Sequence, residues 1–250
     1  MSDKNEHVIA FAGNPNCGKS TLFNALTGAR QEIGNWPGVT VERVEGSYTH
    51  NNENWRIVDL PGIYSLTPNT EDERVARDYL LSGKPDVVVN IVDSTNLSRN
   101  LYLTAQLIEL RIPVVVVLNM MDLSTADGIE IDIGHLSAHL KCPVTGISAV
   151  KQDQVKQLKF FIDEHVHKQE ISSARIKYPN EIEDLAARWS EMLEKKAEDL
   201  KIDPRWMALR LIEEDSWIKD LVLDSGLMDD EEIETGIQGI KNILTETPDM

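Results

Sequence analysis

The stretch Gly13-Asn14-Pro15-Asn16-Cys17-Gly18-Lys19-Ser20 matches the phosphate-binding loop pattern G-x-x-x-x-G-K-[ST] at every specified position. Residues 7–12 before it are apolar enough for a buried strand, and residues 20–26 after it have the pattern of a helix. In such a loop the glycines let the backbone curl, so that successive N–H groups point at phosphate oxygens. Lys19 adds a cation over the terminal phosphates, and Ser20 offers its hydroxyl to Mg²⁺. The stretch therefore predicts a bound nucleotide.

The chain beyond this loop alternates between strand and helix patterns as far as residue 166. Residues 30–43 are the exception, because they show no periodicity and predict a mobile loop that carries Thr40. Several of the strands are apolar on both faces, which favours a mostly parallel sheet flanked by helices, with one antiparallel hairpin at an edge. Ligands of such sheets bind at the carboxyl ends of the strands. Strands are expected at 44–50, 55–60, 86–92, 113–118 and 143–147, and helices at 70–81, 98–110, 132–140 and 154–165.

The pattern changes after residue 171. Three segments, Pro179-Asn180-Glu181, Asp203-Pro204 and Asp229 to Glu232, each have the composition of a helix start and precede apolar residues at helical spacing. No strand pattern occurs in this part. The sequence therefore predicts an α/β domain over residues 1–170 and a small all-α domain over residues 171–250.

Composition excludes several classes of function. The net charge of the 250 residues is −17, and no basic arm is present, so binding to a nucleic acid or an anionic lipid surface is not expected. Two cysteines argue against a disulfide framework and fit a reducing compartment. The longest uninterrupted apolar run, Ile112 to Leu118, is far shorter than the roughly 20 residues that span a bilayer. The chain as given is therefore expected to be soluble.

Two further motifs follow predicted strands. Asp59 and Gly62 have the spacing D-x-x-G, which suits a carboxylate on the Mg²⁺ water shell and a backbone N–H on the γ-phosphate. Asn119 and Asp122 form N-x-x-D, in which a carboxylate can accept both N–H groups of a guanine edge that adenine lacks. The loop Ser148-Ala149 is placed to contact the base with its backbone. Together these motifs predict a guanine nucleotide.

In this order the motifs over residues 7–166 resemble those of the translation-factor-like GTPases, which have a P-loop GTPase (Ras-like) fold. More narrowly, the phosphate loop and the stretches 33–42, 59–66 and 99–103 resemble the cytoplasmic amino-terminal part of bacterial ferrous iron transport protein B, the FeoB family. In that family a helical domain that favours GDP retention (GDI-like) follows the GTPase domain, and a membrane region follows both. The resemblance thus implies a GTP-hydrolysing domain at the cytoplasmic face of the bacterial inner membrane, with the membrane-embedded transporter region of the full-length chain as its partner.

The resemblance also implies the residues of the site. Asn16, Lys19, Thr40 and Gly62 are the expected catalytic residues; Ser20, Thr40 and Asp59 are expected around Mg²⁺, and Asn16 is expected to bind K⁺ near the β,γ-bridge. An Asn16 that only supports the loop is the alternative. The expected nucleotide contacts are Asn14, Pro15, Asn16, Cys17, Gly18, Lys19, Ser20, Thr21, Gly38, Val39, Thr40, Asp59, Gly62, Asn119, Met120, Asp122, Ser148 and Ala149.

Two positions depart from the common GTPase pattern. Ile63 follows the D-x-x-G, where many GTPases carry a glutamine that orients the attacking water, so intrinsic hydrolysis is expected to be slow. Met120 replaces a frequent lysine, which weakens packing over the base, whereas Asp122 keeps the specificity for guanine.

Other residues suggest sites that the sequence does not support. His135 and His139 are four residues apart on a predicted helix but lack a third ligand, so we interpret them as a surface pair. His165 and His167 near a helix end are interpreted as partners of the helix dipole. Cys17 is interpreted as a small packing residue. The sequence gives no evidence for an iron site.

Three functional hypotheses therefore stand. The first is a GTPase with Mg²⁺ and K⁺ that drives or regulates ferrous iron uptake, as a monomer or a homo-oligomer. The second is a soluble GTPase that acts on ribosomes or transfer RNA, against which the acidic composition argues. The third is a GTP-dependent binding switch whose hydrolysis is incidental, which Ile63 keeps open.

Overall fold

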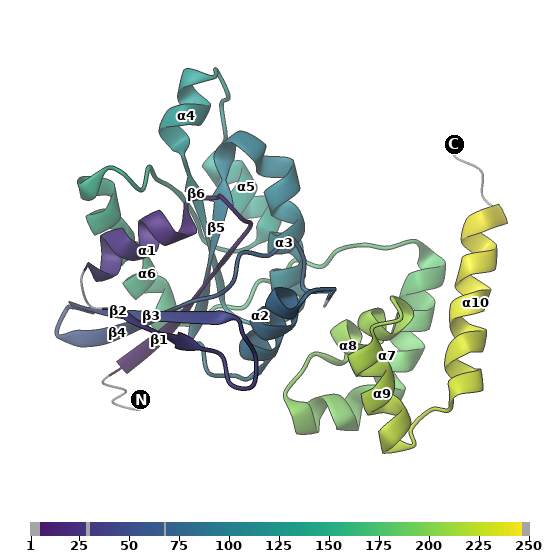
Figure 1. Ribbon diagram of the computed structural model, residues 1–250. Coiled ribbons are helices and arrows are strands. Elements are labelled where there is room, and N and C mark those ends of the chain that lie inside the picture. The colour runs from purple at the N-terminus through teal and green to yellow at the C-terminus, as the bar shows by residue number, and fades with distance from the viewer. Residues whose placement is uncertain (1–5, 29–30, 68, 247–250) are drawn as a thin grey trace. The chain divides into compact units, whose positions relative to one another are not determined.

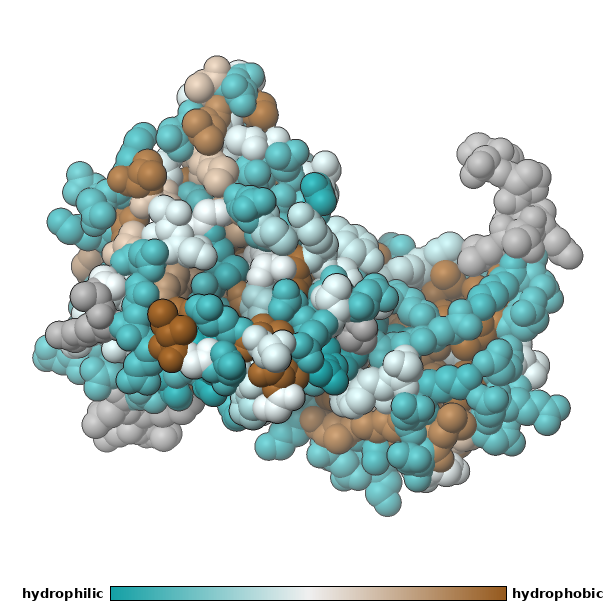
Figure 2. Space-filling model, in the orientation of Figure 1, coloured by the Kyte–Doolittle hydropathy of each residue, from teal (hydrophilic) through white to brown (hydrophobic). Residues whose placement is uncertain are grey.

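The computed structural model describes residues 6–28, 31–67 and 69–246, and these fall into two compact units that divide between Ala174 and Arg175 (Figure 1). The first unit is built around a sheet of seven strands, and the second consists of helices only. Within the described residues no helix combines the length and the apolar character needed to cross a membrane. Figure 2 shows that hydrophilic residues predominate on the face in view of each unit.

The sheet of the first unit has the strand order β2-β3-β4-β1-β5-β6-β7. Strands β4, β1, β5, β6 and β7 are parallel. At one edge β3 pairs antiparallel with β4, and β2 pairs antiparallel with β3. In chain order the elements are β1 (Glu6–Gly13), α1 (Lys19–Thr27), β2 (Gln31–Asn35), β3 (Glu42–His50), β4 (Glu53–Asp59), α2 (Glu71–Leu81), β5 (Val87–Asp93), the 3₁₀ turn η1 (Ser94–Asn96), α3 (Leu97–Glu109), β6 (Val114–Asn119), α4 (Met121–Ala126), α5 (Ile133–Leu140), β7 (Val144–Gly146) and α6 (Gln152–Lys168).

Helices cover both faces of this sheet. Helices α1 and α6 pack together on one face, where alternate residues of the central strands, such as Ile9 and Phe11 of β1, meet Leu22 and Phe23 of α1. Each of these fully buried side chains contributes about 1.5–3 kcal/mol to stability. Helix α3 lies on the other face, where the Asn90 amide of β5 hydrogen-bonds a hydroxyl of that helix (Figure 1). The predicted parallel sheet flanked by helices is therefore confirmed.

Residues 31–35 differ from the sequence-based expectation. The predicted mobile loop over 30–43 is wrong here, because residues 31–35 form β2 and pair with β3; Arg30 lies outside the described residues. The strand buries almost nothing, and Ile33 is 70% exposed. It is therefore held by backbone pairing at a sheet edge, which leaves no hydrophobic alternation in the sequence. The hairpin of β3 and β4 does form, around Asn51 and Asn52, both with positive φ as a type I′ turn requires.

The second unit contains α7 (Asn180–Leu200), α8 (Pro204–Ile212), α9 (Ser216–Ser225) and α10 (Asp230–Glu246). Trp189 of α7 and Trp206 of α8 are buried in its core. Three of these helices begin where the sequence predicts helix starts, but α9 was not expected. Its first turn is capped by Asp215, whose carboxylate accepts hydrogen bonds from the backbone N–H groups of residues 217 and 218. The helix is short, and its signals merge with those of α8 because only residues 213–215 separate the two.

Candidate functional site

The phosphate-binding loop connects the end of β1 to the beginning of α1, as the sequence predicts. Its backbone is tightly packed, because a Cβ atom added at Gly13 would lie 2.6 Å from the Ile91 carbonyl oxygen. At Gly18 a Cβ atom would lie 2.2 Å from Nδ2 of Asn119, and φ there is +84°. Both glycines are therefore required for the loop to close. Asn16 also has positive φ, at 66°, a conformation that asparagine tolerates better than most residues.

A cleft of about 550 Å³ opens over this loop. Ser20 is exposed in the first turn of α1, whose N-terminus points its free N–H groups toward the cleft. Cys17 does not line the cleft, since its side chain is 1% exposed and packs in the core, and burial raises its pKa to about 11. This placement fits the packing role. The cleft is lined by Asn14, Pro15, Asn16, Gly18, Lys19, Ser20, Thr21, Gly62 and Met120.

Lys19 and Asp59 form an ion pair at the cleft, with 2.5 Å between Nζ and Oδ1. Their side chains are 10% and 11% exposed, so the pair is largely shielded from solvent. Burial raises the pKa of Asp59, and the neighbouring ammonium group of Lys19 opposes part of this rise. Each group is thus paired with the other at the position where phosphates and a cation would be bound.

The D-x-x-G segment is joined to the phosphate loop by its backbone. The N–H of Ile63 donates to the Gly13 carbonyl at 3.2 Å, and a Cβ atom at Gly62 would lie 3.2 Å from Cα of Pro15. Gly62 therefore brings its backbone against the loop because it has no side chain. The Ile63 side chain is 2% exposed and packs away from solvent. It offers no hydrogen bond to a water molecule in the cleft.

Asn119, at the end of β6, connects two loops that are far apart in the sequence. Its Nδ2 donates to the Cys17 carbonyl at 3.0 Å, and its Oδ1 accepts from the Ala149 N–H at 2.9 Å. The side chain is buried, at 3% exposure. Both ends of the amide are thereby satisfied, and the phosphate loop is fixed to the loop that follows β7.

Asp122, at the beginning of α4, and Ser148, in the loop after β7, contact each other. The Ser148 hydroxyl donates to Oδ1 of Asp122 at 2.6 Å, and this bond is the main reason that the pKa of Asp122 is lowered. The Ser148 N–H in turn donates to Oε1 of Gln154 at 2.6 Å. Sequence reasoning missed Gln154, whose only signal is a polar side chain near the start of α6. The first of these bonds positions the Asp122 carboxylate, and the second fixes the backbone of Ser148.

The segment that carries Thr40 lies elsewhere in this structure. The Thr40 hydroxyl donates to the Glu71 carboxylate at 3.4 Å, at the beginning of α2. Gly38 and Val39 line a separate hollow against α2. Thus the structure brings the phosphate loop together with Asp59 and Gly62 and with the pairs Asn119–Ala149 and Asp122–Ser148, but not with the predicted contacts at 38–40.

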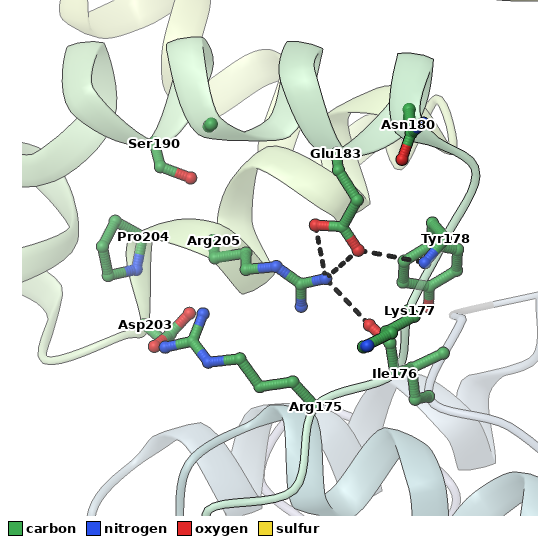
Figure 3. A pocket seen from close by; sticks show the side chains of 11 residues that line it. Arg175, Ile176, Lys177, Tyr178, Asn180, Glu183, Ser190, Asp203, Pro204 and Arg205 are labelled. Atoms are coloured by element: carbon green, nitrogen blue, oxygen red, sulfur yellow. Dashed lines mark hydrogen bonds and ion pairs between the residues drawn. The ribbon is translucent and has the colours of Figure 1, made fainter.

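A second cavity, of about 720 Å³, belongs to the helical unit and is separate from the cleft above (Figure 3). There Arg205 donates to the Glu183 carboxylate at 2.9 Å and to the Ile176 carbonyl at 3.0 Å. The Tyr178 N–H also donates to Glu183. These contacts connect the segment before α7 to α8 and explain the cavity as part of the packing of this unit. None of the residues that the sequence predicts to contact a nucleotide lines it.

Comparison with known families agrees with this arrangement. The family model described as ferrous iron transport protein B matches residues 7–162, and the model described as FeoB cytosolic helical domain matches residues 178–250. The chain is 43% identical over 214 residues to the Fe(2+) transporter FeoB of Escherichia coli (strain K12), and 42% identical over 213 residues to that of Salmonella typhimurium. These alignments cover 83% of the chain but only 27% of each relative.

Solved structures give the same result. A GDP-bound mutant of S. thermophilus NFeoB is 41% identical, with a TM-score of 0.83, over 96% of this chain and 91% of its own. The cytosolic domain of the T. maritima FeoB iron transporter in its GMPPNP form is 34% identical, with a TM-score of 0.84, over 96% of this chain and 98% of its own.

Proposed function

We propose a function on the premise that this chain belongs to the ferrous iron transport protein B (FeoB) family. The chain binds GTP and GDP in the cleft over residues 13–20 and hydrolyses GTP to GDP and phosphate. The observation that carries this proposal is the Asn119 bridge, which fixes the phosphate loop beside the Asp122 carboxylate. A phosphate-binding and a guanine-binding element are thereby held in one cleft. The nucleotide-bound S. thermophilus and T. maritima relatives support this assignment.

Lys19, Ser20, Asp59 and Gly62 have different roles in the proposed phosphoryl transfer. Nucleotide binding separates Lys19 from Asp59, so that the ammonium group neutralises the phosphates and the carboxylate is released. The Ser20 hydroxyl would then ligate Mg²⁺ directly, and the Asp59 carboxylate would accept hydrogen bonds from the water shell of the ion, since Mg²⁺ prefers oxygen ligands and keeps several waters. Mg²⁺, when bound, supplies charge neutralisation to the β- and γ-phosphates. We propose that the Gly62 N–H donates to the γ-phosphate, and the close approach of this backbone to Pro15 supports this role.

Thr40 joins the site only after a rearrangement. Its hydroxyl is bound to Glu71 in this structure, so ligation of Mg²⁺ by Thr40 requires the segment 36–40 to leave α2. We propose that this movement distinguishes the GTP-bound from the GDP-bound form.

Asp122 selects the base. Its carboxylate accepts the two N–H groups of the guanine edge, and the Ser148 hydroxyl holds it in position. An Asp122→Asn variant should lose affinity for GDP by about a hundredfold while it gains affinity for xanthosine diphosphate, which presents an oxygen where guanine has its amino group. A variant that keeps the wild-type preference for GDP over xanthosine diphosphate would exclude this role.

Hydrolysis by this chain is expected to be slow and stimulated by K⁺. Ile63 is buried and cannot orient water, so additional positive charge near the β,γ-bridge has to come from elsewhere. Asn16 lines the cleft beside Lys19 and offers an amide oxygen to a monovalent cation. We propose that it holds K⁺.

The chain spans about a quarter of the length of the curated relatives that it matches. We propose that it is the cytoplasmic part of a ferrous iron transporter, and that GTP binding and hydrolysis here drive or regulate iron uptake by a membrane-embedded region of the full-length protein.

The deciding experiment measures GTP turnover in K⁺ and in Na⁺ buffers of equal ionic strength. Asn16→Gly is the preferred variant, because glycine keeps the positive φ while it removes the amide. Asn52→Gly is the matched control, since Asn52 has φ of 64° in the distant β3–β4 turn.

We expect K⁺ to accelerate GTP hydrolysis by the wild type at least about tenfold, which corresponds to about 1.4 kcal/mol of activation free energy. Asn16→Gly should lose this gain and Asn52→Gly should keep it. Equal rates in the two buffers would overturn the K⁺ assignment, and absence of turnover in both would leave a binding switch.

A further inference from the structure

Three metal-binding side chains meet at the opposite end of the sheet from the phosphate loop. His7 lies at the beginning of β1, Glu53 is the first residue of β4, and His167 lies in the last turn of α6. One ligand atom from each residue lies within 4.8 Å of the other two. His7 is six residues before the end of β1, so about 20 Å of strand separates this cluster from the nucleotide cleft.

The distances fit a common metal ion. Oε2 of Glu53 lies 3.4 Å from Nε2 of His7 and 3.2 Å from Nε2 of His167. A tetrahedral ion with bonds of about 2.0–2.1 Å to nitrogen and oxygen separates its ligand atoms by about 3.3–3.4 Å. Both distances from Glu53 match this separation, and the ligand atoms of the two imidazoles already lie within 4.8 Å of each other.

Ordinary hydrogen bonding does not account for His7. Its side chain is 9% exposed, and its Nε2 atom is buried without a hydrogen-bond partner among the described residues. This atom is close to the Glu53 carboxylate, but it makes no hydrogen bond with it. A buried polar atom without a partner is unfavourable, because it has given up its hydrogen bond with water. A metal ion would supply the missing partner.

A second carboxylate lies beside the three side chains, and one of the histidines is open to solvent. Oδ1 of Asp163 lies 3.0 Å from Nε2 of His167, and Asn51 donates to the other oxygen of this carboxylate at 2.5 Å. Two carboxylates and two imidazoles thus surround the position, which balances the charge of a divalent ion. His167 is 50% exposed, so an ion can enter from solvent on this side.

We propose that His7, Glu53 and His167 bind a divalent first-row transition-metal ion. Two imidazoles and one carboxylate form a donor set that suits Zn²⁺, Co²⁺ and Fe²⁺ and that binds Mg²⁺ poorly. The bound ion links the first strand, the β3–β4 hairpin and the end of α6. This proposal is independent of the proposed GTPase activity, because none of its residues lines the nucleotide cleft.

The test titrates Co²⁺ and then Zn²⁺ into the 250-residue chain with Mg²⁺ in excess, which saturates oxygen-only sites. The visible absorption of Co²⁺ becomes much stronger when the ion passes from octahedral hydration to a tetrahedral site, and calorimetry gives the stoichiometry for Zn²⁺. The exposed pair His135 and His139, whose Nε2 atoms lie 3.1 Å apart, is a competing two-ligand site. All variants are therefore made in a His135→Ala/His139→Ala background.

In this background we expect one equivalent of metal to bind. His167→Ala and Glu53→Gln should each weaken binding about a hundredfold or abolish it, and Zn²⁺ should raise the melting temperature of the parent but not of these variants. Because His7 is buried, His7→Ala is judged only after circular dichroism shows a native fold. If the His135→Ala/His139→Ala protein binds no metal, the metal belongs to the His135–His139 pair and the proposal is overturned. Unchanged affinity in folded His167→Ala and Glu53→Gln would also overturn it.

Discussion

Lys19 and Asp59 neutralise each other across the mouth of the phosphate loop, with 2.5 Å between Nζ and Oδ1. Nucleotide binding must separate them, and therefore it costs the free energy of a shielded ion pair. Asp59→Asn should remove this competition and bind GDP several-fold more tightly than the wild type when Mg²⁺ is chelated. Addition of Mg²⁺ should raise the GDP affinity of this variant only slightly, because the variant lacks the carboxylate that faces the water shell of the metal.

A fluorescent GDP analogue titrated with and without Mg²⁺ measures both effects. Asp220→Asn, on the exposed surface of α9, is the control for the loss of one negative charge. If Asp59→Asn gains as much affinity from Mg²⁺ as the wild type does, Asp59 has no role in the metal shell.

Asn119→Ala should both destabilise the fold and weaken nucleotide binding. The Cys17 carbonyl and the Ala149 N–H lose their shared partner, and buried groups without partners cost about 1–3 kcal/mol in the free energy of unfolding. GDP affinity should fall in addition, since the phosphate loop and the base-binding loop are no longer fixed to each other. Urea denaturation without nucleotide and GDP titration measure the two losses. Asn96→Ala, an exposed asparagine, should change neither; a similar effect of both variants would refute the bridge.

Ser148→Ala should make GDP binding more sensitive to acid. The Ser148 hydroxyl lowers the pKa of Asp122, so its removal moves this pKa upward toward the ordinary value. Binding requires the ionised carboxylate. At pH 7.5 Asp122 is ionised with or without Ser148, and the expected loss, about three- to tenfold, comes from the lost positioning hydrogen bond.

As the pH falls toward 4, the variant protonates before the wild type, and the difference in affinity should widen. Equilibrium titrations of GDP at micromolar protein concentration test this from about pH 7.5 down to about pH 4.5, close to the ordinary pKa of an aspartate. A difference that narrows with falling pH would contradict the assigned role of Ser148.

Two glycines of α10 should respond oppositely to alanine. A Cβ atom at Gly236 would lie 2.5 Å from Cζ2 of Trp189, whose ring is buried at 4% exposure, whereas nothing lies within 4 Å of a Cβ atom at Gly239. Gly236→Ala should therefore destabilise the helical unit by about 1–3 kcal/mol. Gly239→Ala should stabilise it by up to about 1 kcal/mol through helix propensity. Thermal unfolding followed by circular dichroism compares the two, and equal shifts would show that α10 does not pack against Trp189 as described.

The sequence by itself determined the phosphate loop, the alternation of strands and helices and the identity of the base-binding motif. These are local properties: Gly13, Gly18 and Lys19 stand at fixed spacing, and strands apolar on both faces can only be buried in a sheet covered on both sides. The order of Asp59, Asn119 and Ser148 after successive strands also predicted that they would gather at one edge of the sheet.

Only the tertiary structure decided which of these residues touch. It joined Asn119 to both Cys17 and Ala149, placed Gln154 behind Ser148, formed β2 by edge pairing without hydrophobic alternation, and moved Thr40 to Glu71. It also assembled His7, Glu53 and His167 from three elements. The physical reason is the same in each case: side-chain contacts between segments distant in the chain depend on strand register and helix docking, and they leave no periodic trace in the sequence.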